Sequence, residues 1–165
     1  MSGRPALRVL FVCTGNICRS PTAEAVARQR FAEAGLAAVV EFDSAGTHGY
    51  HVGEAPDPRT CEAAMRRGYD LAPLRARRMQ SADFQRFDLL LAMDRGHLEQ
   101  MQDLCPAQLR DRLGLFMDYA PQLDTRDVPD PYYGGRHGFE HVLDLCEAAV
   151  AGLLERVGGR RPASR

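Results

Sequence analysis

A cysteine and an arginine near the start of the chain, Cys13 and Arg19, are separated by five residues. They follow the apolar run Val9–Val12, which is typical of a short buried strand. Ser20 and Pro21 predict the start of a helix, with serine as the N-cap and proline at the first helical position. Backbone N–H groups ahead of a helix bind anions, and the same field favours a thiolate at Cys13. The sequence thus predicts a reactive thiol in an anion-binding loop, where Arg19 can hold a tetrahedral oxyanion.

The residues between the cysteine and the arginine complete the expected phosphate loop. Gly15 allows an unusual backbone turn, and Asn16 tolerates left-handed backbone angles and can form hydrogen bonds within the loop. Ser20 is expected to donate its hydroxyl to the sulfur of Cys13, in addition to capping the helix. Taken alone, a cysteine after a strand is more often a small buried hydrophobic residue, so the argument depends on the whole pattern. The expected phosphate-binding residues are Thr14, Gly15, Asn16, Ile17, Cys18 and Arg19.

This pattern resembles that of the low-molecular-weight protein tyrosine phosphatases. The matching motifs occur in order and span nearly the whole chain: Val12–Pro21, Asp43–Thr47, Phe87–Asp88, Ala92–Asp94 and Asp130–Tyr132. The resemblance implies hydrolysis of phosphotyrosine monoesters through a phospho-cysteine intermediate, without a cofactor. Phosphotyrosine-containing proteins or small aryl phosphates would be the substrates.

A phosphate ester also needs an acid that protonates the leaving oxygen. Asp130 lies between Pro129 and Pro131, which stiffen the loop and fix the direction of the carboxyl group. On the residues alone, Asp124 and Asp127 compete with Asp130 for this role. The resemblance favours Asp130, because such phosphatases carry their acid in an Asp-Pro-Tyr motif.

Aromatic side chains are expected to form the walls of a deep, narrow substrate pocket. The resemblance places Tyr50 and Tyr132 beside the substrate ring, and Tyr133 is a further candidate. Such depth favours phosphotyrosine over phosphoserine, whose shorter side chain could not carry its phosphate to Cys13. Each of the three tyrosines could instead be a surface or packing residue.

Two further positions are interpreted through the resemblance. Similar enzymes use a cysteine pair such as Cys13 and Cys18 for a reversible disulfide that protects the nucleophile from overoxidation, although Cys18 could equally be a buried small residue. Many relatives also place a histidine after the second helix, where it supports the loop asparagine. Leu74 stands near that place here, so we expect Asn16 to be supported from elsewhere, with Ser44 as the candidate.

Strand and helix signals alternate along the chain, which indicates right-handed βαβ units and a parallel sheet covered by helices on both faces. The predicted strands are 9–12, 39–42, 88–92 and 113–117, and the predicted helices are 21–34, 57–68, 83–86, 94–104 and 139–154. We therefore expect an α/β fold of the flavodoxin-like type: a single three-layer domain, 1–165, with a four-stranded parallel sheet. Its ordered core should cover about 7–157, followed by a mobile tail, 158–165. Ligands bind at the carboxyl ends of the strands in such folds, where Cys13 falls.

Composition narrows the function further. The 165 residues include 21 basic and 22 acidic side chains, and the net charge of −1 argues against nucleic-acid or membrane binding. No apolar run approaches the ~20 residues of a membrane span. The five cysteines suit a reducing cytoplasm, and the histidines lack metal-ligand spacing, so we expect no metal. We expect the chain to be a monomer or a weak homodimer, and three arginine clusters to be solvated: Arg66–Arg67, Arg75 with Arg77–Arg78, and Arg160–Arg161.

The residues disfavour three other functions. An arsenate reductase on the same scaffold needs resolving cysteines near residues 80–95, and Met79–Arg95 contains none. A non-catalytic phosphotyrosine-binding module is disfavoured because Cys13, Arg19 and Asp130 are all present. Dinucleotide binding fails because Gly15 is not part of a Gly-x-Gly-x-x-Gly motif.

Overall fold

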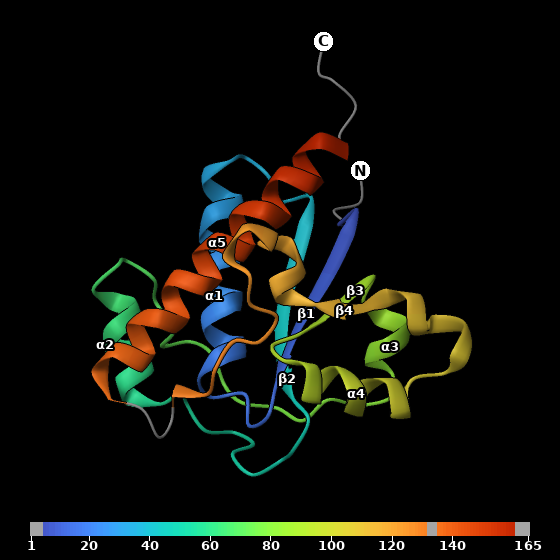
Figure 1. Ribbon diagram of the computed structural model, residues 1–165, viewed down its shortest axis with the longest axis horizontal. Helices are drawn as coiled ribbons and strands as arrows, with labels where there is room; N and C mark the ends of the chain where they lie inside the picture. The colour runs from blue at the N-terminus through green and yellow to red at the C-terminus, as the bar shows by residue number, and fades with distance from the viewer. Residues whose placement is uncertain (1–4, 132–134, 161–165) are drawn as a thin grey trace.

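A four-stranded parallel sheet in the order β2-β1-β3-β4 forms the centre of the protein (Figure 1). The structure is a computed structural model that describes residues 5–131 and 135–160. From β1 the chain passes first to β2 on one side and then to β3 on the other, which creates a switch in strand order beside β1. The strands are β1 (Leu7–Cys13), β2 (Val40–Gly46), β3 (Leu89–Ala92) and β4 (Leu113–Leu115).

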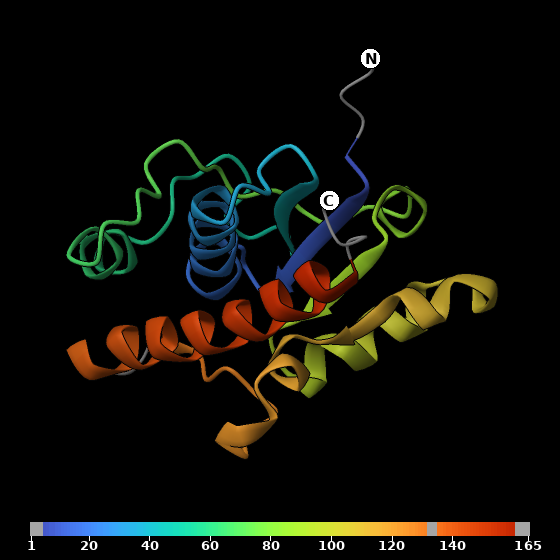
Figure 2. The same ribbon diagram turned by 90° about the horizontal axis from the view of Figure 1, so that it is seen from above.

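Helices cover both faces of the sheet, as Figure 2 shows from above. Helices α1 and α5 pack on one face with α2 beside them, and α3 and α4 pack on the other. The bounds of the helices are α1 (Arg19–Glu33), α2 (Pro58–Met65), α3 (Asp83–Arg86), α4 (Arg95–Leu104) and α5 (Arg136–Arg160). Three short 3-10 helices complete the chain: η1 (Ala107–Arg112), η2 (Phe116–Tyr119) and η3 (Pro121–Leu123).

Strand β1 is apolar throughout its middle because it is buried on both faces. Val9 and Phe11 belong to the core beneath α1 and α5, whereas Leu10 and Val12 belong to the core beneath α3 and α4. The Phe11 ring meets Phe116 edge-on, with ring centroids 5.2 Å apart. Alternate side chains of β1 therefore pack against the helix layers on opposite faces of the sheet. The strand ends at Cys13, the expected nucleophile.

The predicted order of elements is confirmed, but the start of α1 differs from the prediction. The helix begins at Arg19 with Cys18 at the N-cap position, and no side chain caps it. Ser20 is therefore inside the first turn, and the prediction that it caps the helix is wrong. Pro21 also lies in the first turn, where its missing N–H is tolerated.

Other boundaries move by a few residues. Strand β2 extends to Gly46, beyond the predicted end at residue 42, because the strand continues beside β1 as far as Cys13. Strand β4 ends at Leu115, where a 3-10 turn replaces the last two predicted strand residues. Helix α5 continues to Arg160, past the expected end of the ordered core, and residues 161–165 lie outside the described residues. In the described part, no helix is both long and apolar enough to cross a membrane.

Two of the arginines expected to be solvated, Arg67 and Arg77, are only partly exposed and are held in ion pairs. Arg67 contacts Glu147 on α5 at 2.9 Å. Arg77 contacts Asp43 and Asp83, both at 3.1 Å, and so ties the middle of β2 to α3. The interpretation of these arginine clusters as solvated faces is therefore wrong at these two positions, because carboxylates from distant segments lie beside them.

Candidate active site

Carbonyl groups of the loop between β1 and α1 accept hydrogen bonds from neighbouring segments of the chain. In the described part of the chain, no backbone N–H group of residues 14–18 donates to another backbone group. Those N–H groups thus stay available to an anion, as at other helix N-termini. The carbonyls of residues 13, 14 and 17 accept hydrogen bonds from the N–H groups of residues 47, 48 and 57, at 2.8, 3.0 and 2.9 Å.

The left-handed position in this loop is Asn16, whose φ is 61°. Gly15 is not among the described residues with positive φ, so the prediction that Gly15 supplies the unusual turn is wrong. A Cβ at this position would lie 3.0 Å from Cδ2 of His51, tighter than most real Cβ contacts, so the ring of His51 would have to shift by a few tenths of an ångström. Asparagine is among the residues that adopt left-handed angles most easily.

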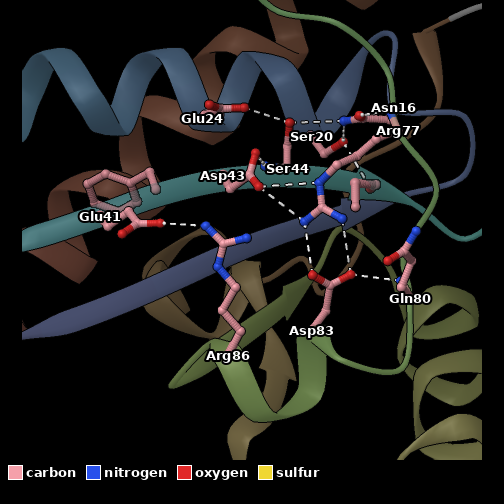
Figure 3. A network of polar contacts seen from close by, with 12 residues as sticks. Asn16, Ser20, Glu24, Glu41, Asp43, Ser44, Arg77, Gln80, Asp83 and Arg86 are labelled. Carbon is pink, nitrogen blue, oxygen red and sulfur yellow. Dashed lines mark hydrogen bonds and ion pairs between the residues drawn. The ribbon is translucent and has the colours of Figure 1, made fainter. Parts of the chain in front are cut away.

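The sulfur of Cys13 lies at the end of a chain of hydrogen bonds. Its Sγ is 3.0 Å from Oγ of Ser20. Nδ2 of Asn16 donates to Oγ of Ser20 and to Oγ of Ser44, each at 2.9 Å (Figure 3). Oδ1 of Asn16 accepts from the backbone N–H of Arg77 at 2.9 Å. Ser44 thus contacts Asn16 as expected, and a backbone N–H group supplies the third contact.

Arg19 is almost fully buried and its two terminal nitrogens have different partners. Nη1 donates to Oδ2 of Asp94 at 3.1 Å and to the carbonyl of Val128 at 3.0 Å. Nη2 lies 3.4 Å from Oγ1 of Thr14 and 3.9 Å from Oδ2 of Asp130. One nitrogen is therefore anchored to the protein, while the other lies on the side of the candidate acid.

Two residues behind the loop were missed by the sequence analysis as site residues. Asp94 caps α4 by accepting from the backbone N–H of His97, and the same carboxylate holds Arg19. The buried ring of His97 places Nε2 2.7 Å from Oγ1 of Thr14. Its Nδ1 lies 3.0 Å from Oδ1 of Asp94, but without hydrogen-bond geometry. The Asp-x-x-His spacing signals a helix cap, but nothing in it signals these contacts with the loop.

Burial keeps the His97 ring neutral at pH 7. Desolvation, followed by the positive charge of Arg19, lowers the pKa of His97 to about 4. The carboxylate of Asp94 acts in the opposite direction but does not prevail. The side chain behind the loop is therefore a neutral hydrogen-bonding group, so Arg19 is not opposed there by a second positive charge.

The three candidate acids have different surroundings. Asp127 accepts hydrogen bonds from the backbone and the guanidinium of Arg95, and these bonds lower the pKa of Asp127, so it is held ionised. Asp124 is exposed, with a φ of 53°, and does not line the cavity at Cys13. Asp130 does line that cavity, and its side chain is 46% exposed.

A cavity of about 290 Å³ opens at the end of β1. Tyr50 is 71% exposed at its edge, and its ring stacks on His48 with centroids 5.0 Å apart. The expected pocket residues Tyr132 and Tyr133 lie outside the described residues. The cavity is lined by Cys13, Thr14, Gly15, Ile17, Cys18, Arg19, Tyr50, His51 and Asp130.

The second cysteine of the loop is a buried thiol. All five cysteines are free, and burial raises the pKa of Cys18 to about 12, so it is protonated at neutral pH. In residues 5–131 and 135–160, no group of three or more histidine, cysteine or acidic side chains could hold a metal ion.

The family model described as "Low molecular weight phosphotyrosine protein phosphatase" matches residues 8–162. The chain belongs to this family. It is 52% identical to a low molecular weight protein-tyrosine-phosphatase of Streptomyces coelicolor, over 93% of this chain and 97% of the relative. A low molecular weight phosphotyrosine protein phosphatase of Schizosaccharomyces pombe is 46% identical, over 81% of this chain and 85% of the relative.

Solved structures of the family agree with this assignment. A protein tyrosine phosphatase of Entamoeba histolytica superimposes with a TM-score of 0.90 and 38% identity, covering 93% of this chain and 97% of that chain. The family match therefore extends over the loop with Cys13, the α4 cap with Asp94 and the segment with Asp130.

Proposed function

We propose that this member of the family hydrolyses phosphotyrosine monoesters in proteins, or small aryl phosphates, through a phospho-cysteine intermediate. The observation that carries this proposal is the meeting of Cys13, Arg19 and Asp130 at one cavity. These residues supply a nucleophile, a fixed cation and an acid, the three groups that cysteine-dependent phosphate transfer requires.

In the first step the phosphate occupies the loop. Backbone N–H groups of residues 14–19 and the guanidinium of Arg19 hold its non-bridging oxygens. The thiolate of Cys13 attacks phosphorus, the S–P bond forms, and the bond from phosphorus to the phenolic oxygen breaks. Asp130 gives its proton to that oxygen, so the product leaves as a neutral phenol. Positioned donors around the transferring group provide most of the catalysis, since the transition state is loose.

In the second step water attacks phosphorus on the side that the phenol has left. The carboxylate of Asp130 accepts the proton of this water, which restores the acid for the next cycle. The S–P bond breaks and its electron pair returns to Cys13. The hydroxyl of Ser20 donates to the sulfur as it becomes negative, which makes the thiolate a better leaving group.

Tyr50 and, outside the described residues, Tyr132 and Tyr133 would flank the phenol ring of the substrate. An aromatic wall of this kind favours an aryl ester, because ring contacts contribute about 0.5–1.5 kcal/mol beyond the area they bury. We expect the protein to act in the cytoplasm, where thiols remain reduced, as a monomer or a weak homodimer.

Turnover of p-nitrophenyl phosphate tests the nucleophile. Cys13→Ser should abolish it, whereas Cys61→Ser, at a thiol on α2 that does not line the cavity, should retain it. An inactive wild-type protein, or an active Cys13→Ser variant, would overturn the proposal. Matched peptides carrying phosphotyrosine, phosphoserine or phosphothreonine then test the substrate, and comparable turnover of all three would contradict an aryl preference.

The acid is tested with a poor leaving group, phenyl phosphate. Asp130→Asn should lower kcat by about 10²–10⁴-fold, the usual contribution of general acid catalysis. The exposed Asp124→Asn is the matched control and should keep kcat within about twofold, because surface changes away from a site have small effects. The assignment fails if the two variants lose kcat equally.

A further inference from the structure

We propose that Glu24, a buried carboxylate on α1, is a positioning residue that directs the hydroxyl hydrogen of Ser20 toward Cys13. This inference rests on the proposed function, because it concerns the same nucleophile. Glu24 is 2% exposed and does not line the cavity at Cys13. It acts through two intervening side chains, those of Ser44 and Asn16, which connect it to Ser20 (Figure 3).

The first link is fixed by the carboxylate. Burial raises the pKa of Glu24, but Oε2 accepts two hydrogen bonds from Arg28, at 2.9 and 2.6 Å, which act in the opposite direction and favour the charged form of the acid. Oε1 lies 2.6 Å from Oγ of Ser44. An ionised carboxylate can only accept hydrogen bonds, so the hydroxyl of Ser44 must donate its one hydrogen to Glu24. The oxygen of Ser44 is then left as an acceptor.

The second link is fixed at both ends of Asn16. Its two Nδ2 hydrogens go to Ser44 and Ser20, each at 2.9 Å, and its Oδ1 accepts from the N–H of Arg77. The amide therefore cannot turn over without losing contacts on both sides. Ser20 receives a hydrogen from Asn16, and its own hydrogen remains available for the sulfur of Cys13, 3.0 Å away.

The competing acceptor for that hydrogen is farther away. The carbonyl of Ala45 lies 3.5 Å from Oγ of Ser20, so the sulfur is the closer acceptor. The carboxylate of Glu24 at one end and the N–H of Arg77 at the other impose the same direction on the chain. We infer that their agreement keeps a donor aimed at Cys13 when the thiolate forms and when it leaves phosphorus.

The variant Glu24→Gln reverses one end of the chain while keeping its shape. Arg28 only donates, so the amide oxygen of the new side chain must face Arg28 and its NH₂ group must face Ser44. The oxygen of Ser44 then accepts hydrogen bonds from both Asn16 and the new amide, and the hydroxyl hydrogen of Ser44 has no acceptor. Asn16 can relieve this only by turning its oxygen toward Ser44 and Ser20, which draws the hydrogen of Ser20 away from Cys13.

Steady-state kinetics with p-nitrophenyl phosphate test this inference. Glu24→Gln should lower kcat about tenfold, the effect of one charge-assisted hydrogen bond, and lower KM with it, so that kcat/KM changes less than twofold. The loss should fall on hydrolysis of the phospho-enzyme, so rapid-mixing measurements should show a clearer initial burst of p-nitrophenol. Glu33→Gln makes the same charge change on an exposed part of α1 and should leave kcat and KM unchanged.

A second variant separates direction from mere structural support. Ser44→Ala removes the conflicting link, so Asn16 takes its orientation from Arg77 alone. Ser44→Ala should therefore lower kcat less than Glu24→Gln, and the double variant should recover to the kcat of Ser44→Ala. A merely structural role predicts instead that the two losses add.

The outcomes distinguish this inference from the proposed function. An inactive wild-type protein would defeat the proposed function itself. An active wild type with an unchanged Glu24→Gln variant would defeat only the role of Glu24. A double variant no more active than Glu24→Gln would also overturn it. If Glu24→Gln fails to fold, kcat of the double variant relative to Ser44→Ala still decides: equal values support the direction, and a further loss contradicts it.

Discussion

The end of β2 approaches the phosphate loop so closely that a single methyl group should displace it. Gly46 pairs with Cys13 across the sheet. A Cβ on Gly46 would lie 2.6 Å from the carbonyl oxygen of Thr14, 3.0 Å from that of His48 and 3.1 Å from the carbonyl carbon of Gly15. All three atoms belong to the backbone, so no side chain can move aside. We predict that Gly46→Ala pushes the loop away from its position.

The size of the effect follows from the overlap. Carbon and oxygen atoms in close contact stand about 3.3–3.6 Å apart, so the carbonyl of Thr14 must move by roughly 0.7–1 Å. Overpacking of this kind costs about 1–3 kcal/mol of stability. A misplacement of about 1 Å can also cost on the order of 100-fold in rate, because catalysis depends on geometry. We therefore expect kcat/KM of the folded Gly46→Ala protein to fall by roughly 10- to 100-fold.

The assay combines kinetics on p-nitrophenyl phosphate with thermal unfolding. Gly114→Ala is the matched control: it adds the same methyl group to β4, where the one atom within 4 Å is a terminal carbon of Leu91 at an ordinary 3.7 Å. Its kcat/KM should stay within about twofold of wild type, as for other tolerated changes away from a site. A Gly46→Ala protein that keeps wild-type kcat/KM, whether or not its melting temperature falls, would refute the reasoning.

Three other measurements test the folded state. Burial lowers the pKa of His97 to about 4, so between pH 6.5 and pH 4 the unfolded chain takes up a proton that the folded protein does not. The free energy of unfolding should therefore be steady above about pH 6.5 and fall by up to about 3 kcal/mol toward pH 4. Urea unfolding measures this fall, and the His97→Asn variant should lack it. Gly152→Ala would force a Cβ against the carbonyl of Tyr119 and should lower the free energy of unfolding by about 3 kcal/mol. Gly158 has open space around it, so Gly158→Ala should leave that free energy unchanged or raise it by up to about 1 kcal/mol. Equal melting temperatures of the two variants would contradict this. The pKa of Cys18 is about 12, so the fraction of its reactive thiolate rises with pH. After hydrogen peroxide treatment, the disulfide between Cys18 and Cys13 should therefore form faster at pH 9 than at pH 7. Mass spectrometry of quenched samples can measure this rate.

The fold could be predicted because its signals are local. Strand β1 is apolar on both faces, and Gly35 and Gly68, with φ of 77° and 88°, follow the ends of α1 and α2 as the sequence suggested. The cysteine and the arginine of the loop were found for the same reason, since both lie in one short segment beside a helix start. Ser20 was misplaced as a cap because its hydroxyl has a stronger use, between Asn16 and the sulfur.

The supports of the loop could not be predicted, because their partners are distant in sequence. Asp94 meets Arg19 across 75 positions, and His97 meets Thr14 across 83. Each of these residues looks like an ordinary helix-start residue until β3 is placed beside β1, which brings the start of α4 next to the loop. Local sequence patterns carry no information about contacts between such distant segments. The sequence therefore predicted the phosphate loop but not the residues at the start of α4 that support it.

The support of Asn16 shows the same limit. The resemblance led us to expect a histidine near Leu74, yet the N–H of Arg77 bonds to Oδ1 of Asn16 without one. Every residue except proline carries such an N–H, so no motif search can find this donor. The position of this donor is fixed in two ways: the carbonyl of Arg77 accepts from the N–H of Gly46 at 2.9 Å, and its guanidinium is held by Asp43 and Asp83. An arginine that looked like solvated surface therefore belongs to a segment that supports the phosphate loop.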